Sequence, residues 1–338
     1  MSDETRPRAV LAMRPAALAD DLFGPGRHLL RQHVDAATVL ESLDDAPAHE
    51  LLAEAEVLIT GWGCPPVTAE VLDRAPRLRA IVHSGGSTVE LIDPSLAATH
   101  GIAVSNAGEA NAIPVAEYAF AAILLANKQA TAAEQLYRQR RDRIDREVEL
   151  RDTGNYRRQV GLVGASRTGR RVAGLLALTD LDVLLYDPYL TDDQATELGA
   201  RRCDLAELMA LSDVVSLHVP STAETAGMIS RALLSLMRDG TTLINTARGT
   251  VLDQDALLDE LRTGRLRAVL DVTTPEPLPA DHELWSLPGV TLTPHIAGAT
   301  GTELRRLGSY VADELARFRQ GTPFAYPDST PTPVVGVP

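Results

Sequence analysis

Short apolar runs alternate with amphipathic stretches along the whole chain. In the first hundred residues, apolar runs of strand length are followed by stretches with helical spacing, and a second series begins near residue 160. Strand followed by helix, repeated, is typical of parallel sheets that carry helices on both faces. The runs that we interpret as strands are Ala9–Met13, Val57–Thr60, Ala80–His83, Ala103–Ser105, Val160–Val163, Val183–Tyr186, Val214–Leu217, Leu243–Asn245, Val269–Leu270 and Val290–Leu292. The pattern predicts an α/β protein with two doubly wound parallel sheets.

Two helical patterns stand apart from this alternation. The stretch Ile113–Arg140 predicts one long helix, opened by Pro114 near its first turn, whose first half is apolar nearly all round. Such a helix is buried on several sides, between domains or between subunits. The pattern at Thr302–Arg319 follows the close of the second series. We expect this last helix to pack on the N-terminal domain and to make that domain discontinuous in sequence.

Composition narrows the class of protein. Lys and Arg total 32 against 46 Asp and Glu, a net charge of −14. Nucleic acids and anionic membranes bind through excess Lys and Arg, so neither is an expected partner. The N-terminal residues lack an apolar signal-peptide core, and no uninterrupted apolar run reaches membrane-spanning length. The two cysteines, Cys64 and Cys203, are too few for a disulfide framework or a thiolate metal site. We expect a soluble cytoplasmic protein.

A small-residue loop opens the second series. Gly164, Ser166 and Gly169 form a G-x-S-x-x-G frame between a predicted strand and a predicted helix. In the dinucleotide fingerprint the first Gly makes the tight turn, the second lets the backbone approach the pyrophosphate, and the third allows close packing of helix on strand. Serine at the second position makes the match imperfect. Small residues at such a turn can also serve packing alone.

Asp187 completes the cofactor signal. It follows the next predicted strand, 18 residues after Gly169, where a carboxylate can accept hydrogen bonds from both hydroxyls of the adenosine ribose. The same carboxylate would repel a 2′-phosphate, which favours NAD over NADP. The alternative is an ordinary Asp–Pro turn at a strand end. Frame, spacing and context together favour the cofactor.

Three charged residues follow three later strands. Arg248, Glu276 and His295 each come shortly after a predicted strand, and the carboxyl ends of parallel strands line one crevice. Hydride transfer at an alcohol carbon needs groups of this kind. Arginine holds a carboxylate with a planar fork, histidine carries the hydroxyl proton, and a carboxylate on the far imidazole nitrogen fixes its tautomer. Each residue alone has a structural alternative: a surface Arg, an acid before Pro, or a strand-end His bonded to backbone.

The ordered segments around these residues resemble the D-isomer-specific 2-hydroxyacid dehydrogenase family, which includes D-3-phosphoglycerate dehydrogenase and glyoxylate/hydroxypyruvate reductase. The resemblance runs from about Trp62 to about Gly321. It is carried by VVSLHVPSTAETAGMI, INTARGTVLDQDAL, AVLDVTTPEPL and TLTPHIAGAT.

The family resemblance implies a role for each matched position. Arg248 binds the substrate, His295 is the acid/base and Glu276 its partner, while Asp271 contacts the nicotinamide amide. The other positions implied to line the cofactor are Gly164, Ser166, Arg167, Thr168, Gly169, Asp187, His218, Val219, Pro220, Thr246, Ala247 and Gly298. The stretch HSGGSTVELID resembles a loop that cradles the substrate carboxylate, at Gly86, Ser87 and Thr88. It departs from the usual family pattern at Thr88 and at Glu90-Leu91, so the substrate side is atypical.

The two strand–helix series, the last helix and the Pro- and Thr-rich tail predict the domain organisation. We expect a discontinuous, flavodoxin-like substrate domain at residues 1–103 and 297–327, a Rossmann-type NAD domain at 104–296, and a disordered tail at 328–338. The two crossings would form a hinge, and the long apolar helix suggests a homodimer. No metal is expected, because Arg248 supplies the electrophilic charge.

The expected function is NAD-dependent hydride transfer at C2 of a small anionic 2-hydroxy or 2-keto acid. One rival is an NAD(H)-sensing binding protein, as in the corepressor relatives of the family. Another is a dehydrogenase of phosphite or phosphonate acids. Turnover of NADH with 2-keto acids separates the enzyme from the sensor.

Overall fold

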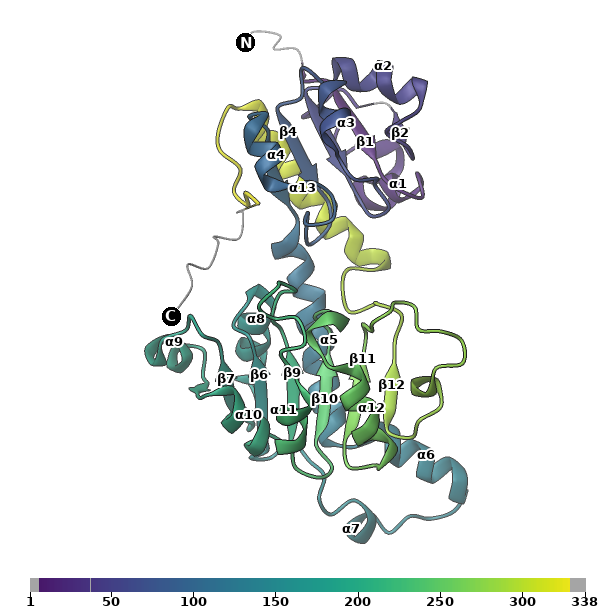
Figure 1. Ribbon diagram of the computed structural model, residues 1–338, viewed down its shortest axis with the longest axis vertical. Coiled ribbons are helices and arrows are strands. Elements are labelled where there is room, and N and C mark those ends of the chain that lie inside the picture. Colours follow the sequence, from purple (N-terminus) through teal and green to yellow (C-terminus); the bar gives the residue numbers. More distant parts are fainter. Residues whose placement is uncertain (1–5, 37, 329–338) are drawn as a thin grey trace. The chain divides into compact units, whose positions relative to one another are not determined.

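The computed structural model describes residues 6–36 and 38–328, and it divides the chain into two compact units (Figure 1). Unit 1 comprises Met1–Asn111 and Ala299–Pro338, and unit 2 comprises Ala112–Gly298. The boundary that we placed at residue 104 falls inside strand β5 (Ala103–Asn106), which pairs with strand β4 (Ala80–His83) of unit 1. The chain therefore leaves unit 1 later than expected, within the following helix.

Unit 1 contains a five-stranded parallel sheet in the order β2-β1-β3-β4-β5. This is the flavodoxin-like order 2-1-3-4-5. The remaining strands are β1 (Ala9–Ala12), β2 (Val39–Leu40) and β3 (Val57–Thr60). Strands β1, β3, β4 and β5 were predicted from the sequence. Strand β2 was not, because two residues are too few to give a periodic pattern.

Helices cover both faces of this sheet. Leu11, Ile59 and Val82 pack against helices α1 and α13, whereas Ala12, Leu58 and Ile81 pack against α2, α3 and α4. The helices of unit 1 are α1 (Leu18–Phe23), α2 (Ala46–Glu54), α3 (Ala69–Asp73), α4 (Pro94–Thr99) and α13 (Leu304–Arg319), with 3-10 helices at Pro25–Arg27 and Gly301–Glu303. Helix α13 thus returns to unit 1, as expected. Its contact with α1 is close, since a Cβ at Gly308 would lie 1.9 Å from the Leu22 carbonyl oxygen.

The segment after α13 runs along strand β5. Pro327 forms an antiparallel bridge with Ser105, and the Asp328 amide donates to the Val104 carbonyl over 2.8 Å. The buried Glu314 carboxylate accepts from the amides of Ala325 and Tyr326. Burial raises the pKa of Glu314, and these two bonds oppose that rise. The chain is therefore held as far as Asp328, and the tail expected to be disordered lies, beyond that residue, outside the described residues.

Unit 2 contains a seven-stranded parallel sheet in the order β12-β11-β10-β9-β6-β7-β8. The chain enters at the interior strand β6, continues through β7 to β8 at one edge, and then returns to add β9 to β12 on the other side of β6. This is the Rossmann order, extended by one strand. The strands are β6 (Gln159–Val163), β7 (Asp182–Tyr186), β8 (Arg201–Arg202), β9 (Val214–Leu217), β10 (Thr242–Asn245), β11 (Arg267–Leu270) and β12 (Val290–Leu292). Only β8, an exposed Arg-Arg pair, was not predicted.

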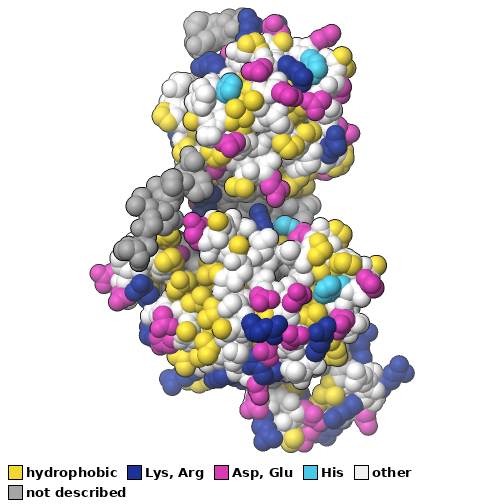
Figure 2. Space-filling model, in the orientation of Figure 1, with side chains coloured by type: hydrophobic (Ala, Val, Ile, Leu, Met, Phe, Trp, Pro, Cys, Tyr) yellow, Lys and Arg dark blue, Asp and Glu magenta, His cyan; other side chains and the backbone are white. Residues whose placement is uncertain are grey.

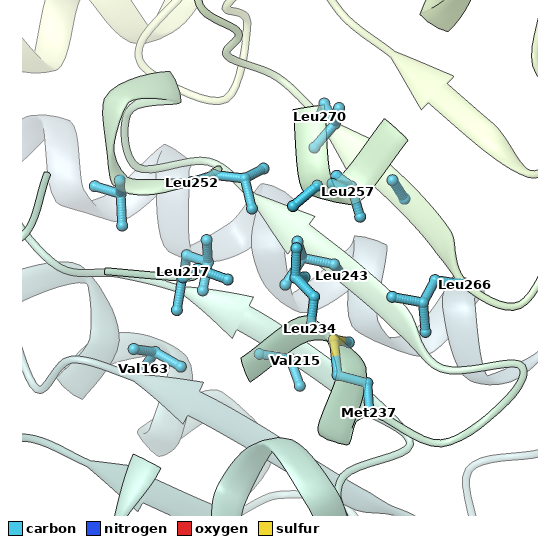
Figure 3. Close-up of a cluster of buried hydrophobic side chains, with 14 of the residues drawn as sticks. Val163, Val215, Leu217, Leu234, Met237, Leu243, Leu252, Leu257, Leu266 and Leu270 are labelled. Carbon is cyan, nitrogen blue, oxygen red and sulfur yellow. The ribbon is translucent and has the colours of Figure 1, made fainter. Parts of the chain in front are cut away.

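Two apolar layers enclose the second sheet. On one face Val215, Leu217 and Leu243 pack against helices α10, α11 and α12, through residues such as Leu234 and Leu257 (Figure 3). On the other face the sheet packs against α5 and α8. The helices of unit 2 are α5 (Gly108–Asn127, which begins in unit 1), α6 (Ala130–Arg140), α7 (Arg146–Glu149), α8 (Arg167–Leu176), α9 (Asp192–Glu197), α10 (Leu205–Leu211), α11 (Arg231–Leu236) and α12 (Gln254–Arg262), with 3-10 helices at Gly249–Val251 and Glu283–Trp285.

The prediction of one long helix over Ile113–Arg140 was wrong. Helices α5 and α6 are separated at Gln129, whose φ of 49° lies in the left-handed region and ends the helical path. The Asn127 carbonyl, released from the helix, accepts from the Gly154 amide over 2.9 Å. Pro114 also lies well inside α5 and not in its first turn, because the helix begins at Gly108.

Helix α5 is long and apolar enough to cross a membrane, by length and composition alone. The core helix of a soluble protein meets the same two criteria. Ala116, Ala119 and Ile123 of α5 are buried against the second sheet.

Basic and acidic side chains are interspersed on the surface (Figure 2). On the face shown in Figure 2, Lys and Arg side chains lie among Asp and Glu side chains. The chain has two tryptophans. Trp62 belongs to unit 1 and is 38% exposed, and Trp285 belongs to unit 2 and is 54% exposed.

Candidate active site

His295 and Glu276 form a hydrogen-bonded pair at the carboxyl end of the second sheet. His295 Nδ1 lies 2.7 Å from Glu276 Oε1, and both side chains are partly exposed. They follow strands β12 and β11, which are adjacent and parallel, so their loops emerge at the same edge of the sheet. An ionised carboxylate only accepts, so Nδ1 carries a proton and Nε2 remains available. The proton is placed on Nδ1 because Nδ1 faces the Glu276 carboxylate.

The backbone at His295 is unusual. Its φ is 54°, in the left-handed region that non-glycine residues rarely adopt. The His295 amide donates to the carbonyls of Asp271 and Thr293, each over 3.0 Å. The Asp271 carboxylate, only 2% exposed, accepts from the amides of Ile296 and Ala297 over 2.8 Å. The imidazole is therefore presented by a loop fixed on both sides of the histidine.

Arg248 lies in the loop after β10, the strand next to β11. The buried Asn245 shapes this loop: its Oδ1 accepts from the Ala247 amide and its Nδ2 donates to the Arg248 carbonyl, both over 3.0 Å. Gly249 lets the loop approach its neighbour, since a Cβ there would lie 2.2 Å from the Thr273 carbonyl oxygen. The Arg248 side chain is exposed, and one of its nitrogens donates to the Ala247 carbonyl. The loops that carry Arg248 and Glu276 are thus in contact.

The loop between β6 and α8 has the geometry of a dinucleotide site. Gly164 has a φ of 103°, and a Cβ there would lie 2.9 Å from the Val219 amide nitrogen. A Cβ at Gly169 would lie 2.0 Å from the Gly164 carbonyl oxygen. Both positions therefore require glycine. Ser166 is the N-cap of α8, and its Oγ accepts from the Gly169 amide over 3.3 Å, which leaves its hydroxyl proton free to donate.

Asp187 follows β7 directly, beside this loop. Its Oδ2 accepts from the Ala165 amide over 2.8 Å and its Oδ1 from the Tyr189 amide over 2.9 Å. The carboxylate is thus oriented at the end of β7, next to the glycine-rich turn. Each oxygen keeps a further lone pair for a ribose hydroxyl.

Buried polar atoms without a partner line the ends of β9 and β10. His218 Nε2 and Thr246 Oγ1 are fully buried and make no hydrogen bond. Burial lowers the pKa of His218 to about 4, so its ring is neutral at physiological pH. These atoms, the two obligatory glycines and Asp187 fit a dinucleotide at the crossover point of a Rossmann sheet. Among the described residues no group of three or more His, Cys, Asp and Glu side chains is arranged to hold a metal ion.

The remaining predicted cofactor residues lie in unit 2. Arg167 and Thr168 begin helix α8, Val219 and Pro220 follow β9, and Gly298 is the last residue of the unit. Ala247 lies beside Arg248.

The predicted substrate loop lies in unit 1, after β4. Thr88 is buried, and its carbonyl accepts from the amides of Leu91 and Ile92. A Cβ at Gly86 would lie 2.9 Å from Asn111 Nδ2, and Ser87 Oγ is 3.4 Å from the Val89 amide. His83 precedes the loop and pairs through Nδ1 with Thr60 Oγ1 over 2.9 Å. Burial lowers the pKa of His83 to about 4.

Sequence reasoning missed the residues that shape these loops. Asn245, Thr293 and Gln254 were not singled out, although Asn245 organises the Arg248 loop and Gln254 bonds both the amide and the carbonyl of Thr274. Asn245 at the end of an apolar strand was a usable signal, because a buried amide side chain needs partners. Thr293 and Gln254 gave no signal of that kind.

Comparisons with known proteins give a consistent result. Residues 120–297 match the model of the NAD binding domain of the D-isomer specific 2-hydroxyacid dehydrogenases. A glyoxylate reductase from Korarchaeum cryptofilum is 35% identical over 258 residues, which are 76% of this chain and 77% of that protein. A D-3-phosphoglycerate dehydrogenase from Archaeoglobus fulgidus is 34% identical over 262 residues, 76% of this chain and 48% of that protein. The chain spans about half the length of the curated phosphoglycerate dehydrogenases that it matches.

Solved structures extend the similarity over nearly the whole chain. The apo D-mandelate dehydrogenase of Rhodotorula graminis has a TM-score of 0.80 at 27% identity, covering 96% of this chain and 98% of that one. A D-lactate dehydrogenase from Treponema pallidum has a TM-score of 0.77 at 27% identity, covering 96% and 100%.

Proposed function

Because the chain belongs to the D-isomer-specific 2-hydroxyacid dehydrogenase family, we propose that it transfers a hydride between NAD and C2 of a small 2-hydroxy or 2-keto acid. The observation that supports this most directly is the 2.7 Å bond between His295 and Glu276, in the loops of two adjacent parallel strands, with Arg248 after the next strand. An acid/base, its partner and a cation for a carboxylate are then gathered at the edge of the sheet that also carries the glycine-rich turn.

Each residue has a distinct task in this proposal. NAD, when bound, supplies the hydride donor or acceptor. Arg248 binds the substrate carboxylate and polarises the adjacent C2 carbonyl. His295 donates a proton from Nε2 to the carbonyl oxygen in reduction, and accepts it back in oxidation. Glu276 accepts a hydrogen bond from Nδ1–H, which fixes the tautomer and stabilises the imidazolium.

The backbone amides at Gly86, Ser87 and Thr88 are proposed to receive the substrate carboxylate. Asp187, which accepts from the Ala165 and Tyr189 amides, is proposed to accept from the adenosine ribose hydroxyls.

A substrate panel tests the proposal. Purified protein is mixed with NADH and with glyoxylate, hydroxypyruvate, pyruvate, phenylglyoxylate and 3-phosphohydroxypyruvate, and absorbance at the NADH band is followed. We expect turnover with at least one 2-keto acid and none with His295→Ala. Phosphite is tested separately with NAD, in the direction of oxidation. Tight NADH binding with no turnover of any keto acid or of phosphite would favour the sensing protein and contradict our proposal.

We also propose that the protein is a homodimer that pairs through the outer side of α5. An apolar groove of about 210 Å³ lies between α5 and strands β11 and β12. Leu125 lines this apolar groove and is 57% exposed, so it adds to the apolar surface that faces water here. A second copy would remove this surface from water. Light scattering should give a dimer for the wild type and a monomer for Leu125→Asp, whereas a wild-type monomer at micromolar concentration would refute the pairing.

A further inference from the structure

Tyr118 lies on α5, away from the residues assigned to the chemistry, yet a chain of hydrogen bonds joins it to the catalytic loop. Its hydroxyl is 2.9 Å from Thr293 Oγ1, and Thr293 Oγ1 is 2.6 Å from Asp271 Oδ1. Asp271 in turn accepts from the amides of Ile296 and Ala297. All of these groups belong to unit 2.

The direction of this chain follows from the donors. A hydroxyl has one proton, and the buried Asp271 carboxylate has none to give when ionised, so Thr293 donates to Asp271. Thr293 can then only accept from Tyr118, and the phenol must donate. Burial and the negative charge of Asp271 raise the pKa of Tyr118, which keeps the phenol protonated. The three groups therefore form one ordered chain, Tyr118 to Thr293 to Asp271.

This series of hydrogen bonds ends on the backbone segment that orients the His295 side chain. Asp271 holds Thr293 before the histidine and Ile296 and Ala297 after it, and His295 between them has a φ of 54°. A non-glycine residue in this conformation costs about 1–3 kcal/mol and persists only where its surroundings enforce it. Loss of one member of the chain should therefore let the loop relax and turn the imidazole away from its working orientation.

We propose that Tyr118 and Thr293 are positioning residues for His295 and act through the Asp271 carboxylate. The expected effect on kcat rests on the proposed function. The expected effect on the orientation of the imidazole is independent of it. Neither hydroxyl is assigned to the reacting atoms, because the Tyr118 hydroxyl donates to Thr293 and the Thr293 hydroxyl donates to Asp271. Their contribution is to hold the loop in the one shape that places His295 against Glu276.

Four variants test the order of the chain. Tyr118→Phe removes one hydroxyl and should lower kcat by about threefold to tenfold, the worth of a single net hydrogen bond. Thr293→Val leaves the Tyr118 hydroxyl without its partner and removes one of the three hydrogen bonds that the Asp271 carboxylate accepts, so it should lower kcat by about 10- to 100-fold. Thr293→Ser keeps the hydroxyl and should restore most of the activity. The double variant Tyr118→Phe/Thr293→Val should be no worse than Thr293→Val alone, because Tyr118 acts only through Thr293.

Control measurements separate positioning from stability. Tyr156→Phe, at a tyrosine that is 70% exposed, removes a hydroxyl from the same unit and should leave kcat unchanged. The Kd for NADH should stay within about twofold of wild type in Tyr118→Phe, Thr293→Ser and Tyr156→Phe, which keep the hydrogen bond from residue 293 to Asp271.

A second readout does not need turnover. The His295 Cε1–H resonance is identified by its loss in His295→Ala, and its chemical shift is followed from pH 5 to pH 9. We expect Tyr118→Phe and Thr293→Val to move this titration curve, and Thr293→Ser and Tyr156→Phe to keep it. If the wild type turns over no keto acid, the proposed function fails and the resonance alone decides the inference. Unchanged kcat and an unchanged curve in Thr293→Val, with only a lower Tm, would overturn the positioning role.

Discussion

Each catalytic side chain at this site is oriented by hydrogen bonds from its neighbours. His295 is aimed by the Asp271 carboxylate and paired with Glu276, while Arg248 depends on the buried amide of Asn245. The contribution of one side chain to kcat can therefore be measured by substituting that side chain alone. A change confined to one side chain leaves the loop that presents it in place.

His295→Ala should lower kcat by about 10²–10⁴, the usual worth of a general acid/base, while the Kd for NADH changes little. Glu276→Gln keeps a hydrogen-bonding partner but removes the charge that favours the imidazolium. The pH range over which the reduction proceeds should then move downward. Steady-state kinetics from pH 5 to pH 9 measures both effects. Wild-type kinetics in both variants would show that the pair is misassigned.

Asp187 should make the protein prefer NADH to NADPH. Its carboxylate is fixed at the end of β7 by the amides of Ala165 and Tyr189, where it would meet a 2′-phosphate with like charge. Asp187→Asn keeps the shape and removes the repulsion, so the ratio of kcat/KM for the two cofactors should fall. Equal or better kcat/KM of the wild type with NADPH would refute this reading of Asp187.

Ser166 combines two opposing effects. Its Oγ caps α8 by accepting from the Gly169 amide, and its free proton can reach a phosphate oxygen. Ser166→Gly should keep or tighten NADH binding, because glycine is an adequate cap and adds no bulk. Ser166→Val removes the cap, at a cost of about 1 kcal/mol, and adds a branched side chain at the loop. Fluorescence titration of NADH should rank the affinities Gly ≥ Ser > Val. Equal binding by Val would mean that the pyrophosphate does not lie against this loop.

At the scale of elements, the close approach of α13 to α1 depends on one glycine. A Cβ at Gly308 would meet the Leu22 carbonyl, so Gly308→Ala should lower the free energy of unfolding by about 1–3 kcal/mol. Gly174 in α8 is the matched control, because a Cβ there meets nothing within 4 Å. Gly174→Ala should raise the free energy of unfolding by about 0.5–1 kcal/mol, as alanine favours a helix. Urea unfolding of both variants is the measurement, and a stability gain in Gly308→Ala would contradict the packing described.

Most strands were predictable because an apolar run between turn residues is a local property. The three loops with Arg248, Glu276 and His295 were predictable for the same reason, since each follows such a run. Strands β2 and β8 were not, because two residues carry no period and their pairing is decided by a neighbouring strand. The break between α5 and α6 at Gln129 was also beyond prediction, because glutamine has no special preference for the left-handed region.

The site itself was predictable only as a set of chemical groups. His295 has a left-handed backbone, and the Asp271 carboxylate accepts from the amides of Ile296 and Ala297. Both features depend on contacts between the loops that follow β11 and β12. The resemblance implies that Asp271 contacts the nicotinamide amide. The sequence contained no hint that this carboxylate already accepts two backbone amides and a hydroxyl.

For the whole molecule, two buried histidines link stability to pH. His83 in unit 1 and His218 in unit 2 each have a pKa lowered by burial to about 4, against 6.5 in the unfolded chain. Between these values the unfolded state binds more protons, so stability is full above pH 6.5 and falls as pH drops toward 4. From pH 7 to pH 5 each histidine should remove roughly 2 kcal/mol from the free energy of unfolding.

Urea unfolding at pH 7, 6 and 5 measures this slope. His83→Asn and His218→Asn should each flatten it, whatever their effect on stability at pH 7. His100→Asn, changed at an exposed position, is the control and should keep the wild-type slope. A slope that neither buried variant alters would mean that other groups govern the acid sensitivity.

The placement of the two tryptophans gives each unit its own optical probe. Trp62 reports on unit 1 and Trp285 on unit 2, so Trp62→Phe and Trp285→Phe each leave the intrinsic fluorescence of one unit. Units that unfold independently would show different midpoints in the two variants, whereas a single cooperative transition would give coincident curves. Trp285 also shares its unit with the proposed dinucleotide site, so quenching of its emission by NADH would report binding without any label. The chain therefore carries, in its own sequence, the means to follow one unit at a time.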